Sequence, residues 1–135
     1  MKRLIAGCSL LFLMLHCSAP KNDDIENITC QQASDLIQEF RNNTSFIILD
    51  LRTEDMFMEE HIENSIYHDV FSEDFEDWLK GLDKEKVYLL YCNVGHRSGI
   101  ALKKMKEMGF KNLYHLHEGI RVWKEQDFPT VRNDE

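Results

Sequence analysis

The sequence predicts a single α/β domain, with a mostly parallel sheet of about five strands and helices on both faces. Two observations carry this prediction. The runs at 46–49 and 87–91 are continuously apolar and rich in strand-favouring residues, which is typical of strands buried on both faces. Segments with helical spacing of apolar residues alternate with these runs, as they do in parallel sheets. A chain of 135 residues has room for one such domain.

The first half of the chain opens with a helix whose start is marked by a capping box. Thr29 is the expected N-cap, and Gln32 stands where a side chain can reach back to it. Apolar residues at helical spacing follow, so this helix has one buried face. The elements expected here are a helix, a strand, a short polar helix, a short strand and a helix ended by Gly81, at 30–41, 46–49, 53–61, 65–67 and 72–80.

The second half is expected to continue the alternation with a strand, a helix, a strand and a helix, at 87–91, 98–108, 113–116 and 119–126. The helix at 98–108 places apolar residues on one face and lysines on the other, and Gly109 ends it. Sites in parallel sheets form at the carboxyl ends of the strands. The segment 50–52 and the segment 92–98 both follow a predicted buried strand, so both are expected at that edge.

The composition indicates a folded, acidic protein. Hydrophobic residues make up 43% of the chain, which is enough for a packed core. The formal net charge is −8 at pH 7, and it grows more negative without residues 1–19, which hold two basic residues and no acidic one. Because such a surface repels phosphate backbones, nucleic acid is not expected as a partner.

The first 19 residues are predicted to be an export signal rather than part of the fold. Lys2 and Arg3 precede an apolar run of about a dozen residues, which is shorter than the ~20 needed to span a bilayer. The polar segment 20–24 then forms a tether. The domain is expected over 25–131, followed by a tail at 132–135.

Two forms of processing fit this signal. Cys17 ends the apolar run and precedes the tether, as a lipidated cysteine does, although His16 stands where bacterial lipoprotein signals carry a small residue. The alternative is cleavage after Ala19, against which Pro20 argues. We favour lipidation at Cys17, so the protein is expected in the periplasm or anchored to a membrane of a bacterium. Membrane contact is expected only through that possible lipid anchor.

The segment 92–98 has the features of an activated thiol site. Cys92 follows a buried strand, a loop containing Gly95 comes next, and a helix begins at once. Backbone N–H groups from Asn93 to Ser98 can form an anion nest, and the helix dipole and Arg97 add positive charge. These features favour the thiolate of Cys92 at a pH where a free cysteine, with a pKa of about 8.5, is mostly protonated. A buried structural cysteine is the alternative.

The chain from about Ile25 to Val131 resembles a single-domain rhodanese. Four segments carry the resemblance: the strand ending in Asp-x-Arg, the His61 segment, the active-site loop and the Trp123 ending, at 46–52, 60–66, 92–98 and 118–123. Glu60, Glu63, Asn64 and Glu118 depart from the family, which prefers Gly, Pro, Gly and Gly there. These departures leave the local turn geometry open.

The resemblance implies a sulfurtransferase. Cys92 would be the catalytic nucleophile, taking a sulfane sulfur from thiosulfate or a related small sulfur anion and holding it as a persulfide. A thiol, in a small molecule or a protein, or cyanide in assays, would accept the sulfur. The implied donor-binding loop is Asn93, Val94, Gly95, His96, Arg97 and Ser98, with Asp50 and Arg52 as supporting residues. No metal and no organic cofactor are implied.

Two other functions remain open at this point. A cysteine-based phosphatase or arsenate reductase of related fold also uses a cysteine in an anion loop. Four residues separate Cys92 from Arg97, which is similar to rhodaneses, whereas related dual-specificity phosphatases carry one residue more. A non-catalytic rhodanese-like docking module is the second rival, but such a module has no need of a reactive thiol.

Several further residues attract functional interpretations. His61 resembles a family histidine that serves the fold, and His96 lies in the loop, where it could tune donor choice or proton supply. His115 and His117 would share one strand face, but a metal site would need a third ligand, so a solvated pair is expected. Cys30 is expected to be structural, although one disulfide with Cys92 is conceivable in an exported protein.

Overall fold

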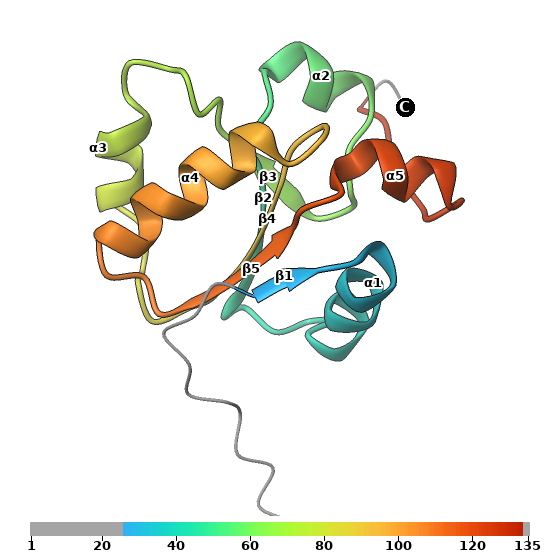
Figure 1. Ribbon diagram of the computed structural model, residues 1–135, viewed down its shortest axis with the longest axis horizontal. Helices are drawn as coiled ribbons and strands as arrows, with labels where there is room; N and C mark the ends of the chain where they lie inside the picture. Colours follow the sequence, from blue (N-terminus) through green and yellow to red (C-terminus); the bar gives the residue numbers. More distant parts are fainter. Residues whose placement is uncertain (1–25, 134–135) are drawn as a thin grey trace, which may run out of the picture.

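The computed structural model of the protein describes residues 26–133. The expected signal segment at 1–19, the tether at 20–24 and Cys17 therefore lie outside the described residues. In the described part, strands and helices alternate from the short strand β1 to helix α5 (Figure 1). No helix between residues 26 and 133 is long and apolar enough to cross a membrane.

Within these residues a single sheet of five parallel strands forms in the order β1-β5-β4-β2-β3, with β4 at its centre. The strands are β1 Glu26–Ile28, β2 Phe46–Asp50, β3 Ser65–Tyr67, β4 Val87–Tyr91 and β5 Asn112–Leu116. The predicted α/β class with a parallel sheet is confirmed. The sequence pattern does not single out β1, because three residues are too few to show a strand periodicity.

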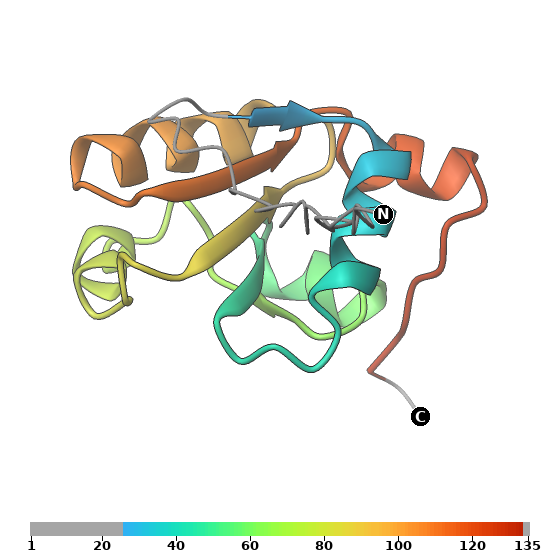
Figure 2. The ribbon, with the colours of Figure 1, turned by 90° about the horizontal axis from the view of Figure 1, so that it is seen from below.

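Helices cover both faces of this sheet, as predicted. They are α1 Cys30–Glu39, α2 Glu54–Glu59, α3 Phe75–Lys80, α4 His96–Glu107 and α5 Gly119–Glu125. Figures 1 and 2 show α3 and α4 on one face, and α1 and α5 on the other. The capping box of α1 forms as expected, since the Thr29 hydroxyl accepts from the Gln32 N–H and the Gln32 side chain accepts from the Thr29 N–H.

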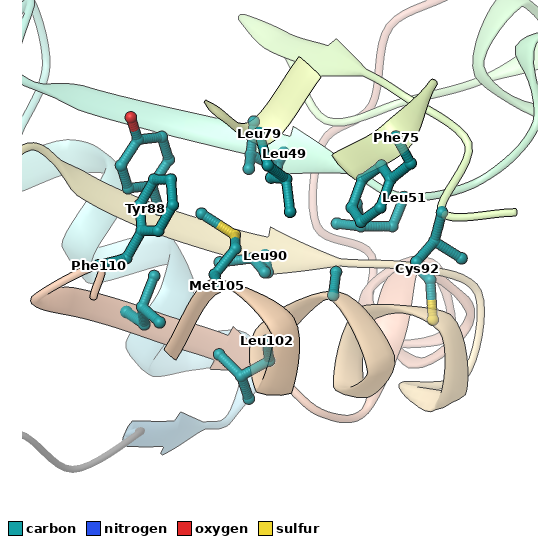
Figure 3. Packing of buried hydrophobic residues seen from close by; sticks show 13 residues of the cluster. Leu49, Leu51, Phe75, Leu79, Tyr88, Leu90, Cys92, Leu102, Met105 and Phe110 are labelled. Atoms are coloured by element: carbon teal, nitrogen blue, oxygen red, sulfur yellow. The ribbon is translucent and has the colours of Figure 1, made fainter. Parts of the chain in front are cut away.

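Two hydrophobic clusters fill the space between the sheet and its helices. Successive side chains of a strand point to opposite faces. Leu90 and Cys92 therefore pack in the cluster under α3 and α4, which Figure 3 shows, while Leu89 and Tyr91 pack in the cluster under α1 and α5. Trp123 is 2% exposed and packs in this second cluster. The central strand β4 is thus covered on both faces.

Helix α4 begins two residues earlier than the apolar pattern predicts, at His96 rather than Ser98. Gly95 is its N-cap and adopts a φ of 89°, in the left-handed region that favours glycine. The chain therefore turns directly from the loop into the helix. As a result, the loop after β4 comprises only 92–95, and His96 and Arg97 belong to the first turn of α4.

Helix α3 begins later than the pattern predicts, at Phe75 rather than Ser72. The residues before it form a turn, in which both the N–H and the hydroxyl of Ser72 donate to the carbonyl oxygen of Asp69. Serine competes for the backbone in this way and so favours turns and helix starts over helix interiors.

The departures from the rhodanese turn pattern have local accommodations. Asn64 adopts a φ of 63°, and asparagine tolerates this left-handed conformation better than most residues. Glu60 is extended, and its carboxylate binds Lys124 and Thr130. Glu118 accepts a hydrogen bond from the Cys30 N–H at 3.0 Å, so it caps the start of α1. The turn geometry left open by the sequence is therefore formed with different residues.

Candidate active site

Cys92 lies directly after β4, at the carboxyl edge of the sheet, with its sulfur beside the first turn of α4 (Figure 3). The residue is 1% exposed and its thiol is free. Its Sγ accepts a hydrogen bond from the Gly95 N–H at 3.1 Å and lies 3.3 Å from the Ser98 hydroxyl, which can donate to the sulfur in its thiolate form. The loop therefore curls around the sulfur, as the sequence predicts for an anion-holding loop.

The start of α4 adds a favourable electric field at this sulfur. The first N–H groups of a helix lack partners within the helix, and the aligned peptide dipoles place partial positive charge there. Because Gly95 and Ser98 both bond the sulfur and both belong to the start of α4, Cys92 Sγ lies at this end of the helix. Negative charge on the sulfur is stabilised by this arrangement.

The loop is clamped from the other side by the start of α5. The N–H groups of Ile120 and Arg121 donate to the carbonyl oxygens of Cys92 and Asn93, at 2.9 and 3.1 Å. Gly119, with a φ of 73°, passes so close to the Asn93 carbonyl that a Cβ atom would overlap it. These contacts explain why Gly119, the first residue of α5, belongs to the same site as Cys92, which lies 27 residues earlier.

Gly95 is the second glycine of the site that lies close to another backbone segment, here at His117. Its φ of 89° disfavours any side chain, and a Cβ atom there would overlap the carbonyl oxygen of His117. Gly109 has nearly the same φ, 88°, but no heavy atom within 4 Å of an added Cβ. An alanine at Gly109 would meet only the strain of the left-handed backbone, whereas an alanine at Gly95 would meet that strain and a steric overlap as well.

We expect Gly95→Ala to destabilise the protein by about 2–5 kcal/mol, the sum of a left-handed alanine and a clash with backbone, and to lower activity at Cys92. The matched variant Gly109→Ala carries only the first contribution, about 1–2 kcal/mol. Urea unfolding of both variants measures the difference. Equal losses at the two positions would show that the close packing of Gly95 against His117 is unimportant.

Arg97 lies at the surface of the loop, held by residues outside it. Its Nη1 is 3.6 Å from Met56 Sδ, and its guanidinium carbon lies 5.6 Å from the centre of the Phe71 ring. Phe71 is 60% exposed, and Val94 in the loop is 47% exposed. The cation–π contact places the charge beside an apolar rim. The donor-binding role predicted for Arg97 stays a prediction.

The predicted loop residues thus divide into two groups. Gly95 and Ser98 contact the sulfur directly, and Ser98 is fully buried. The side chains of Asn93, Val94 and His96 are exposed around it. Any selection of donor by this second group would be exerted at the entrance rather than at the sulfur.

Asp50 and Arg52 form a buried ion pair beside the loop. Asp50 is 0% and Arg52 6% exposed, and Arg52 Nη2 lies 2.7 Å from Asp50 Oδ2 and donates to the Glu60 carbonyl at 2.6 Å. Burial opposes the charge of Arg52, but the hydrogen bonds and charge of Asp50 outweigh it and raise the pKa of Arg52. The guanidinium carbon also lies 5.8 Å from the centre of the Tyr91 ring. The pair ties the end of β2 to β4 and the segment after α2, which fits the supporting role predicted for it.

Cys30 is a thiol of a different kind. It is fully buried at the start of α1. Burial, together with the hydrogen bond and the negative charge of Glu118, raises the pKa of the Cys30 thiol to about 12. Because the thiolate is the reactive form of a cysteine, the Cys30 thiol is unreactive at neutral pH.

His115 is the residue at the site that sequence reasoning missed. The prediction of a solvated histidine pair is wrong for it: His115 is 6% exposed, and its Nε2 lies 2.8 Å from the Ser98 hydroxyl. His117, beyond the end of β5, is exposed as expected. The missed signal is strand alternation, since His115 follows buried Leu113 by two residues.

Among residues 26–133, no group of three or more His, Cys, Asp or Glu side chains is placed to hold a metal ion.

Comparisons with known proteins show the family and the fold of this chain. A family model described as a Rhodanese-like domain matches residues 31–126. The thiosulfate sulfurtransferase GlpE of Coxiella burnetii is 33% identical over 86 residues, which are 64% of this chain and 78% of that protein. A tRNA uridine(34) hydroxylase of Yersinia pestis is 32% identical over 116 residues, covering 78% of this chain but 32% of that protein. The crystal structure of a rhodanese-related protein from Thermoplasma volcanium has a TM-score of 0.65 at 27% identity, covering 78% of this chain and 97% of that one.

Proposed function

The chain belongs to the rhodanese-like domain family, and on this premise we propose that it transfers sulfane sulfur, which it carries as a persulfide on Cys92. The observation that supports this proposal most strongly is the environment of Cys92 Sγ. A backbone N–H, a buried hydroxyl and the start of a 12-residue helix all surround this one sulfur. Such surroundings stabilise a thiolate, which is the nucleophile that sulfur transfer requires.

The proposed reaction has two steps. In the first, the Cys92 thiolate attacks the outer sulfur of thiosulfate or a related anion. A new S–S bond forms to Cys92, the S–S bond of the donor breaks, and its electron pair leaves with sulfite. In the second, an acceptor thiolate or cyanide attacks the outer sulfur of the persulfide, and the bond to Cys92 breaks to restore the thiolate. The groups that stabilise the thiolate also stabilise the anionic persulfide.

The loop also selects sulfur over phosphate. Gly95 N–H reaches Cys92 Sγ at 3.1 Å, so the amide closest to the sulfur is already in hydrogen-bond contact with it. The outer sulfur of a persulfide on Cys92 would extend outward from the loop amides that surround Cys92 Sγ. A phosphoryl group must instead sit over the sulfur with three oxygens reaching the loop amides. Only four residues separate Cys92 from Arg97, so the loop encloses less space than the phosphatase loop, which carries one residue more.

We therefore expect measurable sulfur transfer from thiosulfate to cyanide, and no comparable hydrolysis of an aryl phosphate. Both rates are measured on the same purified protein, the first by thiocyanate formation and the second by phenol release. Insertion of one glycine after Gly95 widens the loop, so it should lower sulfur transfer. Phosphate turnover faster than sulfur transfer in the wild type would refute the assignment.

A further inference from the structure

A chain of hydrogen bonds leads away from Cys92 to the far edge of the sheet; it is buried at Cys92, Ser98 and His115 and reaches the surface at Asn27. The Ser98 hydroxyl lies 3.3 Å from Cys92 Sγ and 2.8 Å from His115 Nε2. On the other side of the ring, His115 Nδ1 lies 2.9 Å from Asn27 Oδ1. The sulfur lies directly after β4, and the hydroxyl, the imidazole and the amide come from α4, β5 and β1. The two-step function proposed above uses neither His115 nor Asn27.

The position of Asn27 is set by strand pairing. Asn27 of β1 stands directly opposite His115 of β5 in the parallel register, so their side chains share one face of the sheet. Ser98 is fully buried beneath the ring. Both imidazole nitrogens are therefore occupied by polar partners, one of which also contacts the candidate nucleophile.

Counting protons gives the chain a direction. At neutral pH His115 carries a single N–H, because burial, with a smaller contribution from His117, lowers the pKa of His115 to about 4. Asn27 Oδ1 can only accept, so that proton is on Nδ1 and Nε2 is a bare acceptor. Ser98 then donates its hydroxyl proton to Nε2, the nearest of its acceptors, and turns a lone pair toward the Cys92 thiol.

We propose that Ser98, His115 and Asn27 form a relay that takes up the Cys92 thiol proton and returns it when the sulfur is released. The S–H bond of Cys92 breaks as its proton moves to Ser98 Oγ, and the Ser98 proton moves to His115 Nε2. The products are a thiolate and an imidazolium, whose Nδ1–H donates to Asn27 Oδ1. No electron is gained or lost, and the reverse movement restores the thiol. Ser98 contacts the reacting sulfur, whereas His115 and Asn27 act through Ser98 and are positioning residues.

The groups that face His115 fit this role. Ser98 from α4 links it to the thiol of Cys92 at the end of β4, and Asn27 from β1 is neutral. His117, which follows β5, is the neighbouring titratable group, and its charge disfavours a second imidazolium. In the proposed relay the imidazolium of His115 forms only together with the Cys92 thiolate, whose negative charge offsets the burial and the His117 charge that disfavour it.

The test is the pH dependence of Cys92 alkylation by iodoacetamide, read by mass spectrometry of the Cys92 peptide. Alkylation reports the thiolate fraction and needs no sulfur donor, so it remains informative even if the proposed sulfur transfer fails. Asn27→Asp places a carboxylate against Nδ1–H, which strengthens this hydrogen bond most in the imidazolium. We expect the alkylation midpoint to fall by about one pH unit, the difference between a neutral and a charge-assisted bond.

The sign of this shift separates the relay from a direct charge effect. A carboxylate acting on the sulfur by Coulomb repulsion alone would raise the midpoint, so a rise or no change in Asn27→Asp overturns the relay. In a His115→Gln background, Asn27→Asp should no longer lower the midpoint. His115→Gln by itself should raise it by about one unit, since glutamine cannot take the proton. An unchanged midpoint in His115→Gln also overturns the relay. Glu26→Gln, an exposed charge change on the same strand, is the control and should leave the midpoint in place.

Discussion

Replacement of Cys92 by serine is expected to lower sulfur transfer by roughly 10³-fold or more, because an alcohol is a far weaker nucleophile than a thiolate and cannot hold a persulfide. The fold should survive this change. Serine is close in size to cysteine, and its oxygen can accept the same hydrogen bonds from Gly95 and Ser98. Thiocyanate formation from thiosulfate and cyanide measures the loss, and urea unfolding measures stability.

Cys30→Ser is the matched control for this prediction. Cys30 is equally buried, but its thiol is held protonated beside Glu118. The control variant should keep most of its activity even if it loses some stability. Full activity in Cys92→Ser, or loss of activity in Cys30→Ser at unchanged stability, would show that Cys92 is not the thiol that carries the chemistry.

The largest effect on stability is expected from Arg52→Met. This change leaves the fully buried Asp50 carboxylate without its ion-pair partner and removes the hydrogen bond to the Glu60 carbonyl. Breaking a buried pair in this way costs about 3–5 kcal/mol. A domain of this size is typically stable by about 5–15 kcal/mol, so Arg52→Met should unfold at a clearly lower urea concentration than the wild type.

The double variant Asp50→Leu with Arg52→Met separates the unpaired charge from the lost contacts. Removing both charges avoids leaving a buried carboxylate, so the double variant should be more stable than Arg52→Met alone. Urea unfolding of both single variants and the double variant completes the cycle. A double variant less stable than either single variant would mean that the loss comes from packing rather than from the buried charge.

The elements that could be predicted from the sequence are those with a strong local pattern. The predicted bounds of β4 at 87–91 are those of the structure, because a continuous apolar run between polar segments marks both ends. β1 could not be predicted from the sequence, because its three residues form a strand only through pairing with β5. The start of α4 was misplaced by two residues, because helical spacing carries no information about the left-handed conformation of Gly95.

The site divides in the same way. Cys92, Gly95 and Ser98 lie within seven residues, so one local motif predicts that they meet. Asn27 and His115 are separated by 88 residues, and only the register of β1 against β5 brings them together. The position of Gly119 could be predicted only in part. The family resemblance covers this glycine, but the close contact with the Asn93 carbonyl, which leaves no room for a side chain, is seen only in the structure.

The central claim, that sulfur is carried on Cys92, is tested most directly by intact and peptide mass spectrometry of the wild-type protein after incubation with thiosulfate. The account predicts a gain equal to the mass of one sulfur atom, located on the Cys92 peptide and removed by cyanide with release of thiocyanate. Cys92→Ser should show no such gain. A wild-type protein that gains no sulfur, or gains it at Cys30, would contradict the account.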